Sequence, residues 1–459
     1  MKNKKIGFIV IEVLMSNLAV TGTHWGDEGK GRVVYLLSGR QFSDNSGQKV
    51  AGIKCIGAHN AGNGATVGGK KVKVHLLPIT VARPNTISID TEGVLVDQEA
   101  LLDKEIPYLE SIGVNLHGRT YFSSEARLIL THHKEIEGRG IGKKLGTTLR
   151  GVGPAAADRE VRMGVRFYDL QNGHAADILK IVTRVYGLKH EYPQRELEKQ
   201  LRLYERMKEK VTFRNTEKLM RELLDTGARL VFHVSHGGML DLKRGSHPYV
   251  TSANAMIDSI PANTGINLRD LDLRVVSTIK AYTTRVGEGP LPSEISGEVA
   301  EDLRRCGDEY GVSTGRPRRI GWHDTVAGKY VIQKNRPDAL AVIALDVFDN
   351  QDEILVCVGY NYKGSPMKDF EFPDSPTDLV HCTARYRNFR GWKTPTNDIR
   401  YYGKLPEQAR TYLDFLSDTY ETPIALVTVG PAEDAVIYTD ASRILRKEDT
   451  CGIGIYDDA

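Results

Sequence analysis

Cysteine is scarce in this chain, and its few copies are poorly placed for the structures that cysteines usually build. There are five, Cys55, Cys306, Cys357, Cys382 and Cys451, an odd number scattered over 459 residues. No two of them have the C-x-x-C spacing of a zinc site, and an odd, scattered set argues against a disulfide framework. We therefore expect free thiols and a reducing, cytoplasmic location.

An excess of charge of one sign is also lacking. The 62 Lys and Arg residues nearly balance the 59 Asp and Glu residues, which leaves a formal net charge of +3. A bias this small gives no bulk attraction to nucleic acid or to a membrane surface. The composition therefore predicts small-molecule partners, with no nucleic-acid partner and no membrane partner.

Long apolar runs are missing as well, since no segment approaches the length of a membrane span. The opening stretch MKNKKIGFIVIEVLM has the lysines and apolar residues of a signal peptide, but Glu12 interrupts it and no small-residue cleavage site follows cleanly. We expect residues 1–14 to be a dispensable extension, with Met15 as the functional start. No repeat or linker divides residues 15–459, which are predicted to form a single domain.

The chain does have a glycine-rich loop, THWGDEGKGR (23–32). It follows a short apolar run, NLAVTG (17–22), and leads into GKGRVVYLLSGR (29–40), whose apolar residues have helical spacing. Glycine turns that open a helix point backbone N–H groups at an anion, and Lys30 adds a positive charge for phosphates. This strand, loop and helix unit predicts nucleotide binding.

The first loop departs from the standard phosphate-loop pattern. His24 and Gly31 stand where the G-x-x-x-x-G-K-[ST] rule needs Gly and Ser or Thr. The loop also contains Asp27, and a carboxylate beside phosphates repels them unless a cation lies between, or unless the carboxylate acts as a base on the substrate. The position of Asp27 therefore indicates a chemical role.

Apolar runs of strand length recur along the chain. They are VAGIKCIG (50–57), KVKVHLLP (71–78), ARLVFHV (228–234), RVVSTIKAY (274–282), ALAVIALDV (339–347), ILVCVGYNY (354–362) and IALVTVG (424–430). Several have the continuous apolar character of buried strands, and helical patterns with one apolar face occur at 194–210 and 217–227. The pattern predicts an α/β fold with one large, mostly parallel central β-sheet flanked by helices, with helical and small sheet insertions.

Four further stretches have the composition of anion-binding loops. They are GAHNAGNGAT (57–66), GTTLRGVGPAAADREVR (146–162), HPYVTSAN (247–254) and STGRPRRIGWHDT (313–325). Each alone is most often a turn or a solvated surface, but their occurrence together with the first loop favours a phosphate-rich ligand. Arg316, Arg318 and Arg319 have the planar guanidinium groups that grip carboxylate or phosphate through two hydrogen bonds.

Taken in chain order, these stretches resemble the adenylosuccinate synthetase family. The matching strings are GTHWGDEGKGR, GAHNAG, GTTLRGVGP, HPYVTSAN, AYTTRVGEGPLPSE, STGRPRRIGWHDT, ALDVFD and TVGP, from about Asn17 to the C-terminus. The resemblance implies a fold related to the P-loop NTPases. It also implies a Mg²⁺-dependent, homodimeric ligase that forms adenylosuccinate from IMP and L-aspartate while GTP becomes GDP and phosphate.

In this family the γ-phosphoryl group moves to O6 of the purine, and the aspartate amine then displaces phosphate at C6. The resemblance implies that Asp27 takes the proton from purine N1 and also binds Mg²⁺, together with the backbone carbonyl of Gly62. Loss of that proton pushes charge onto O6, which becomes a nucleophile toward phosphorus. Lys30 would neutralise the phosphoryl charge as it develops.

The resemblance also distributes other residues among three ligands. For the purine monophosphate it implies Asn60, Thr148, Arg162, His236, Thr251 and Arg316, with Arg162 donated by the second subunit of the homodimer. For L-aspartate it implies Val312, Ser313, Thr314, Gly315, Arg316 and Arg318. For GTP it implies Gly26, Glu28, Gly29, Lys30, Gly31, Arg32, Gly64, Arg318, Asp346, Thr428 and Gly430, with the Asp346 carboxylate accepting from guanine N1 and N2.

The chain departs from the family pattern inside both nucleotide sites. Asn63 stands where the family has the His that assists phosphorylation of O6, and an amide carries neither the charge nor the transferable proton of an imidazole. A positioned acid is worth ~10²–10⁴ in rate, so this change matters if the position is used as in the family. His236 and His233 replace the Gln and Glu of a family FEGAQG string, Ala344 replaces a common Lys, and Leu149 replaces a usual Gly.

Three interpretations of these departures stay open. In the first, the protein acts on IMP and His236 or His59 compensates for the lost imidazole. In the second, the same chemistry acts on a different purine nucleotide such as dGMP or GMP, with ATP or GTP. Phage members of the wider family that act on dGMP replace the Asp of the first loop, whereas this chain retains Asp27. In the third, the protein is a catalytically impaired, nucleotide-binding paralogue.

Overall fold

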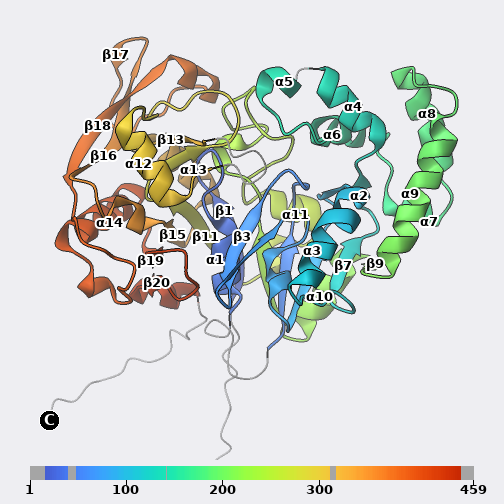
Figure 1. Ribbon diagram of the computed structural model, residues 1–459, viewed down its shortest axis with the longest axis horizontal. Helices are drawn as coiled ribbons and strands as arrows, with labels where there is room; N and C mark the ends of the chain where they lie inside the picture. Colours follow the sequence, from blue (N-terminus) through green and yellow to red (C-terminus); the bar gives the residue numbers. More distant parts are fainter. Residues whose placement is uncertain (1–15, 40–47, 141, 311–316, 446–459) are drawn as a thin grey trace, which may run out of the picture.

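The computed structural model describes residues 16–39, 48–140, 142–310 and 317–445. Its centre is a ten-stranded β-sheet with the order β20-β19-β15-β11-β1-β10-β2-β5-β7-β9 (Figure 1). All neighbouring strands are parallel except β19 and β20. The strands are β1 (Asn17–Gly22), β2 (Val50–Lys54), β5 (Thr86–Asp90), β7 (Thr120–Ser123), β9 (Thr212–Arg214), β10 (Arg229–His233), β11 (Leu273–Lys280), β15 (Ala339–Ile343), β19 (Ile424–Thr428) and β20 (Val436–Tyr438). The predicted large, mostly parallel sheet is confirmed.

Helices cover both faces of this sheet. Leu18 and Val20 of β1 pack in one apolar cluster with helix α1 (Lys30–Leu37), whereas Ala19 between them packs in another cluster with helix α10 (Thr216–Asp225). Successive residues of a strand point to opposite faces, so α1 and α10 lie on opposite sides of the sheet. This explains why the central strands read as continuous apolar runs.

Helical segments form an insertion on one side of the molecule, beyond strand β7 in Figure 1. Its longest helices, α8 and α9, pack against each other, and the helical pattern predicted at 194–210 corresponds to α9. The insertion comprises α4 (Thr131–Arg139), α5 (Gly142–Leu145), α6 (Val152–Glu160), α7 (Phe167–Gln171), α8 (Ala175–Tyr186) and α9 (Tyr192–Lys208). The other helices are α2 (Gln98–Ala100), α3 (Ile106–Ser111), α11 (Ser259–Thr264), α12 (Glu298–Gly307), α13 (Thr325–Asn335) and α14 (Glu407–Tyr420).

Small sheets account for two predicted strands that were wrongly assigned to the central sheet. The run at 71–78 lies in β4 (Lys70–Val74), which pairs only with β3 (Asn63–Val67) in a hairpin. The run at 354–362 lies in β16 (Glu353–Tyr362), which pairs with β14 (His323–Asp324), β17 (Ser365–Pro366) and β18 (Cys382–Arg390), opposite the helical insertion in Figure 1. The remaining pairs are β6 (Leu95–Val96) with β8 (Arg127–Leu128), and β12 (Thr283–Arg285) with β13 (Arg319–Gly321).

The physical reason for the error is that an apolar run records burial, and small sheets bury their strands too. Conversely, the central strands β5, β7, β9 and β20 are only three to five residues long, and the first three of them include polar residues, so no long apolar run predicted them. The expected extension at residues 1–14 lies outside the described residues. Within the described part of the chain, no helix is long and apolar enough to span a membrane.

Gly52 in strand β2 gives a stability prediction. A Cβ atom at this position would lie 1.9 Å from Thr80 Oγ1 and 2.7 Å from Thr80 Cβ. Forcing an extra methyl group into a packed interior costs about 1–3 kcal/mol, so Gly52→Ala should lower the free energy of unfolding by about that amount in urea titrations. The control is Gly138→Ala in helix α4, where no heavy atom lies within 4 Å of the added Cβ. Equal stability of the two variants would contradict the prediction.

Candidate active site

The predicted site residues collect at one edge of the central sheet, where six adjacent parallel strands end. In sheet order the predicted positions are Thr428 at the end of β19, Asp346 after β15, the first loop after β1, His236 after β10 and Asn60 after β2. Lys280, which was not predicted, stands at the end of β11 between Asp346 and the first loop. Ligands of open parallel sheets bind outside the carboxyl ends of the strands. The first loop therefore lies between the residues predicted for the triphosphate and those predicted for the monophosphate.

The Glu28 carboxylate joins two parts of the first loop. Glu28 accepts the backbone N–H of His24 through Oε1 at 2.5 Å, and its Oε2 lies 2.8 Å from Lys30 Nζ. Both side chains of the Glu28–Lys30 pair are buried, with 2% and 6% of their surface exposed. Lys30 is thus held at the start of helix α1 by an ion pair within the loop.

Two glycines are needed for the first loop to lie against the segment that follows β10. A Cβ on Gly22 would meet Glu28 Oε2 at 2.0 Å and the His236 carbonyl oxygen at 2.9 Å. A Cβ on Gly237 would meet the His24 carbonyl oxygen at 2.1 Å and Glu28 Oε1 at 2.6 Å. These approaches join the loop after β1 to the loop after β10, which carries His236.

Asp27 lies in a cluster of four charged groups. Its Oδ2 is 2.6 Å from Arg318 Nη1 and 3.7 Å from Lys280 Nζ. Arg318 Nη1 also donates to Glu309 Oε2 at 2.7 Å, and Lys280 forms an ion pair with Glu309 Oε1. Tyr282 donates its hydroxyl to Glu309 Oε1 at 2.5 Å. Two carboxylates and two cations therefore balance one another beside the first loop.

Burial and the neighbouring charges shift the pKa values of the two carboxyl groups of this cluster, Asp27 and Glu309, in opposite directions. Burial raises the pKa of Asp27 above its ordinary value, and Glu309 raises it further, while Lys280 and Arg318 offset part of the rise. For Glu309, burial also acts upward, but the hydrogen bonds and charges of Lys280, Tyr282 and Arg318 outweigh it and lower the pKa to about 2. Glu309 is thus a fixed counter-charge, and Asp27 is the carboxyl group that is easier to protonate.

The turn after β2 carries buried polar atoms that have no hydrogen-bond partner within the described part of the chain. They include His59 Nδ1, Asn60 Oδ1 and Asn63 Nδ2, and Thr147 Oγ1 in the helical insertion is also unpartnered. Buried polar atoms are normally satisfied, so orphaned atoms on facing loops indicate a place for a polar ligand. Asn63 begins strand β3 with 8% of its surface exposed, and its backbone and Cβ lie against Gly31 of helix α1.

Two histidines stand beside this turn and are neutral. Burial lowers the pKa of His236 to about 3, with further lowering by Lys30 and Lys54. Burial likewise holds the pKa of His233 well below its usual range, and neither ring nitrogen of His233 has a partner among the described residues. His236 Nε2 lies 3.4 Å from Thr251 Oγ1, so the structure brings these two predicted monophosphate residues together.

The residues predicted for the phosphate of the monophosphate lie on other loops. Thr148 is exposed on the segment before α6, while Thr251 is partly buried. Arg162 follows helix α6, is exposed and has a left-handed backbone with φ 68°. Its neighbour Val161 is 58% exposed, so this corner of the helical insertion presents both a charge and an apolar side chain to the surroundings.

The residues predicted for GTP form a compact set beyond β15 and β19. Burial raises the pKa of Asp346 to about 6. Thr428 Oγ1 accepts the backbone N–H of Ala344 at 2.9 Å, which ties the two strand ends together. Arg32 of helix α1 donates to the carbonyl oxygens of Gly430 and Ala432, the latter at 2.6 Å. Helix α1 is thereby fastened to the loop that follows β19.

Other predicted GTP contacts are the glycines of the first loop and the start of the hairpin. Gly26 and Gly29 have positive φ values of 91° and 74°, and Gly31 and Gly64 approach each other, since a Cβ on Gly31 would lie 2.9 Å from the Gly64 nitrogen. Gly62, predicted as a metal ligand through its carbonyl, is exposed beside His75.

The residues predicted for L-aspartate are only partly covered. Val312, Ser313, Thr314, Gly315 and Arg316 lie outside the described residues. Arg318 is described, and its contact with Asp27 brings one predicted aspartate residue to the first loop.

Some residues in the loops that carry the predicted site residues have a strained backbone. Among the described residues, eleven non-glycine residues have positive φ, and five of them, Asp27, Leu149, Arg162, His236 and Ala344, have φ between 54° and 68° in these loops. The other six are Asp308, Arg336, Lys363, Phe370, Lys393 and Glu421. For a residue with a Cβ this conformation costs of order 1–3 kcal/mol, and such residues cluster at functional sites. Each of these five belongs to a stretch that the sequence singled out.

One cluster outside this edge has the composition of a metal site. Ligand atoms of His132, His133 and Asp158 lie within 4.8 Å of one another. However, His133 Nδ1 accepts the backbone N–H of Leu130 at 2.9 Å, so its proton is on Nε2, which donates to Asp158 Oδ2 at 2.9 Å. Tyr186 donates to the other oxygen of Asp158. A protonated nitrogen cannot bind a metal, so this cluster is a hydrogen-bond network of the helical insertion.

Sequence reasoning missed Lys280, Glu309 and Tyr282. A Lys at the carboxyl end of a buried strand and a tyrosine two residues later are visible in RVVSTIKAY, which was assigned only as a strand. For Glu309 no local signal exists, because its role comes from contacts with residues 27 to 29 positions away along the chain and with Asp27 across the sheet edge.

A parallel α/β sheet with a glycine-rich phosphate loop between two sets of nucleotide-type residues defines an enzyme class that transfers groups to or from nucleotides. Comparison with known proteins gives the particular family. The family model described as adenylosuccinate synthetase matches residues 19–437, and the chain belongs to this family.

Relatives cover nearly the whole chain. Adenylosuccinate synthetase of Thermodesulfovibrio yellowstonii is 35% identical over 440 residues, 93% of this chain and 100% of the relative. That of Aquifex aeolicus is 36% identical over 440 residues, 92% of this chain and 97% of the relative. The fully ligated adenylosuccinate synthetase from Plasmodium falciparum has a TM-score of 0.83 at 30% identity, covering 92% of this chain and all of that one.

A more distant structure shares the fold alone. Succinoaminodeoxyadenylate synthetase of cyanophage S-2L, bound to dGMP and to dATP as an energy donor, has a TM-score of 0.59 at 17% identity. It covers 94% of this chain and 97% of that one.

Gly237 gives a prediction for the site. Gly237→Ala would drive a methyl group against the His24 carbonyl and Glu28 Oε1, so the first loop must shift. We expect the affinity for magnesium nucleoside triphosphate, measured by calorimetry, to fall at least ~10-fold, because misplacement of about 1 Å costs up to ~10²-fold in positioned sites. Gly153→Ala is the control, since its Cβ would meet no atom closer than 3.6 Å. Wild-type affinity in Gly237→Ala would show that the close approach is dispensable.

Proposed function

We propose that this protein joins IMP to L-aspartate at C6 of the purine, with hydrolysis of GTP to GDP and phosphate, and so forms adenylosuccinate. The observation that carries the proposal is the position of the first loop. It places Asp27 and Lys30 between Asp346 and Thr428 on one side and Asn60 and His236 on the other. The named activity of relatives that are 35% and 36% identical over almost the full chain supports it.

In the proposed reaction Asp27 is the base at purine N1. A carboxyl group with a raised pKa is a better proton acceptor than an ordinary Asp, and burial raises the pKa of Asp27. Removal of the N1 proton places charge on O6, which attacks the γ-phosphorus. Lys30 stabilises the charge that develops on the transferring group, and the aspartate amine then replaces the phosphate at C6.

Mg²⁺ fits the residues proposed to bind it. A carboxylate oxygen of Asp27 and the carbonyl oxygen of Gly62 are the hard oxygen donors that Mg²⁺ prefers, and Gly62 itself is exposed. When bound, the ion would neutralise charge on the triphosphate. The chain's own part is to hold these oxygens on the first loop and on the turn after β2.

Arg318 is proposed to exchange partners when aspartate binds. Its guanidinium group rests on Asp27 Oδ2 at 2.6 Å and on Glu309 Oε2 at 2.7 Å. The carboxylates of the substrate aspartate have the same chemistry as these two partners. Arg316 and residues 312–315 remain predicted contacts for the same ligand.

A homodimer in which Arg162 reaches the partner's site is proposed as the working unit. The exposed guanidinium of Arg162, the strained backbone at this residue and the exposed side chain of Val161 support an interface here. A cytoplasmic location stays a prediction, supported by the free thiols of the four cysteines in the described part of the chain, Cys55, Cys306, Cys357 and Cys382.

A different purine nucleotide, such as dGMP or GMP with ATP or GTP, is the second candidate substrate. The observation that favours it is the pair of neutral imidazoles, His233 and His236, of which His236 lies close to Gly57 at the start of the turn after β2. A neutral imidazole donates through one nitrogen and accepts through the other, so it can discriminate among purines by their exocyclic groups. Retention of Asp27, Glu28 and Lys30 counts against an impaired paralogue.

The direct test is turnover by the protein and by Asp27→Ala. Purified protein with Mg²⁺ and L-aspartate is assayed for phosphate release with IMP, GMP and dGMP, each with GTP or ATP. We expect IMP with GTP to give the highest kcat/KM, and Asp27→Ala to lose at least ~10²-fold in kcat while its melting temperature stays unchanged. A higher kcat/KM with dGMP or GMP would establish the second candidate, and unchanged turnover in Asp27→Ala would remove the proposed mechanism.

Asp346 predicts a pH dependence of GTP binding. Its pKa is raised to about 6, so the free protein gains the carboxylate that accepts from guanine only as the pH rises through that value. Affinity for GTP should increase roughly tenfold between about pH 5 and about pH 7 on account of this group. In calorimetric titrations Asp346→Asn should bind GTP weakly and lose this part of the increase. An equal increase in Asp346→Asn would assign the pH dependence to the nucleotide alone.

A further inference from the structure

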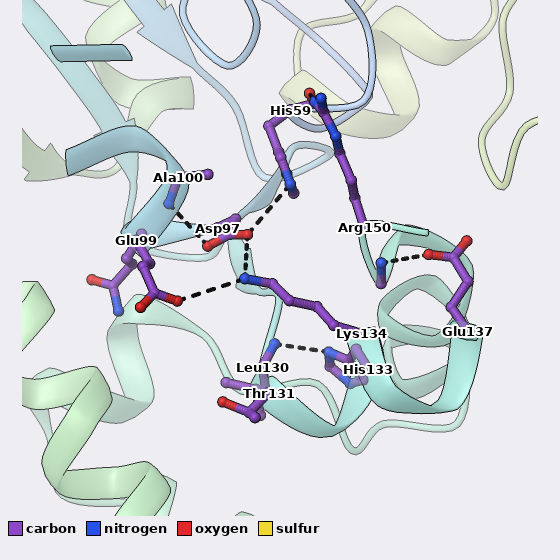
Figure 2. Close-up of polar contacts among 12 residues, drawn as sticks. His59, Asp97, Glu99, Ala100, Leu130, Thr131, His133, Lys134, Glu137 and Arg150 are labelled. Atoms are coloured by element: carbon purple, nitrogen blue, oxygen red, sulfur yellow. Dashed lines mark hydrogen bonds and ion pairs between the residues drawn. The ribbon is translucent and has the colours of Figure 1, made fainter. Parts of the chain in front are cut away.

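The turn that carries Asn60, Gly62 and Asn63 is attached to the helical insertion through the residue that precedes it, His59. The His59 side chain is buried, and its Nε2 lies 3.3 Å from Asp97 Oδ2. The His59 carbonyl oxygen accepts from Arg150 Nη1 (Figure 2). Both attachments come from outside the turn.

The side-chain attachment continues to helix α4. Asp97 Oδ2 lies 2.7 Å from Lys134 Nζ, and Asp97 is 3% exposed whereas Lys134 is 36% exposed. The other oxygen of Asp97 accepts the Ala100 backbone N–H at 3.2 Å, which caps helix α2. Asp97 is therefore fixed in place, with Lys134 on one side and His59 on the other, as Figure 2 shows.

The backbone attachment returns to the same helix. Glu137, one turn after Lys134 on α4, accepts the Gly151 backbone N–H. Gly151 directly follows Arg150, so this hydrogen bond fixes the segment from which Arg150 reaches the His59 carbonyl. Helix α4 thus fastens His59 by two routes, one through its ring and one through its backbone.

The charges of the three groups determine the kind of contact that joins His59 to Asp97 and Lys134. Burial lowers the pKa of His59 to about 4, and Arg150 and Lys134 lower it further against the opposing effect of Asp97. The ring is neutral at pH 7, so the charge pair is Asp97 with Lys134, and the ring makes a polar contact with Asp97, with Nε2 3.3 Å from Oδ2. A carboxylate beside one ring nitrogen favours one orientation of the imidazole.

We infer that Asp97 and Lys134 are positioning residues of the nucleotide site, which hold His59 and therefore the Asn60–Asn63 turn in register with the first loop. This inference rests on the proposed function, because the position of the turn matters for turnover only if the turn binds the monophosphate. The segment that carries Thr147 and Thr148 is held by the same helix, so α4 sets the distance between two walls of the monophosphate site. Loss of the Asp97 charge should loosen the turn without opening the core.

The chain offers matched variants. Asp97→Asn removes the charge but keeps the shape and the capping oxygen, since Asn is as good an N-cap as Asp. Lys134→Met keeps the aliphatic stem. Glu99→Gln is the control, because Glu99 also approaches Lys134 Nζ, at 3.7 Å, but it is 47% exposed and has no contact with His59 among the described residues.

The experiment measures kinetics and amide hydrogen exchange on the full-length protein. We expect Asp97→Asn and Lys134→Met each to lower kcat about 10-fold and to raise the KM for the monophosphate more than the KM for GTP. The double variant should lose no more activity than either single variant, because the two residues act as a unit. Peptides covering 57–64 should exchange about 10-fold faster in both variants than in wild type or Glu99→Gln, with unchanged exchange in β1 and β10.

Three outcomes would overturn the inference: wild-type exchange of 57–64 in Asp97→Asn, an equal loss in Glu99→Gln, or additive losses in the double variant. The exchange measurement needs no substrate. If wild-type protein turned over none of the purines, the proposed function would fail, and the comparison of 57–64 between Asp97→Asn and Glu99→Gln would still decide whether this attachment holds the turn.

Discussion

The buried ion pair between Glu28 and Lys30 is the contact on which the rest of the site depends. The two groups are 2.8 Å apart and almost inaccessible to water, and removing one partner of such a pair leaves an uncompensated buried charge that costs about 3–5 kcal/mol. The same Glu28 accepts the His24 N–H, so it also fixes the path of the chain out of β1. Glycine is required at positions 22 and 237, because a Cβ atom at either position would occupy the space of the Glu28 carboxylate.

Around that loop, neighbouring charges and burial set the ionisation of Asp27, the proposed base. Glu309, with its pKa lowered to about 2, pairs with Lys280 and Arg318, and Asp27 shares those cations at the edge of the cluster. A ligand carboxylate or phosphate that draws Arg318 away leaves Lys280 beside Asp27. The cluster thus links occupation of the proposed aspartate site to the environment of the proposed base.

How much of this was predictable depends on the range of the contacts involved. Local sequence patterns predict the strand and loop around Asp27 and helix α1. They also predict the strands that lead to His236, Lys280, Asp346 and Thr428, because buried parallel strands and glycine turns can be recognised within a short stretch of sequence. The central strands β5 and β9 have no such signature, because they are only five and three residues long, include polar residues and owe their place to neighbouring strands.

The same limit applies to the site. Asp27 and Arg318 were predicted as separate motifs, but their 2.6 Å contact and the shared partner Glu309 join segments almost 300 residues apart. His59 was noted only as a substitute imidazole, whereas its ring is turned toward Asp97. Where a side chain points is decided by tertiary contacts, and no single window of sequence contains them.

The central claim is that O6 of the purine receives the phosphoryl group, and isotope labelling tests it most directly. The protein is incubated with Mg²⁺, GTP, L-aspartate and IMP carrying ¹⁸O at position 6, and the released phosphate is examined by mass spectrometry. The account predicts one ¹⁸O atom from IMP in each phosphate, because the C6–O6 bond breaks when the amine displaces the phosphorylated oxygen. Phosphate that carries only oxygen from GTP and water would contradict it.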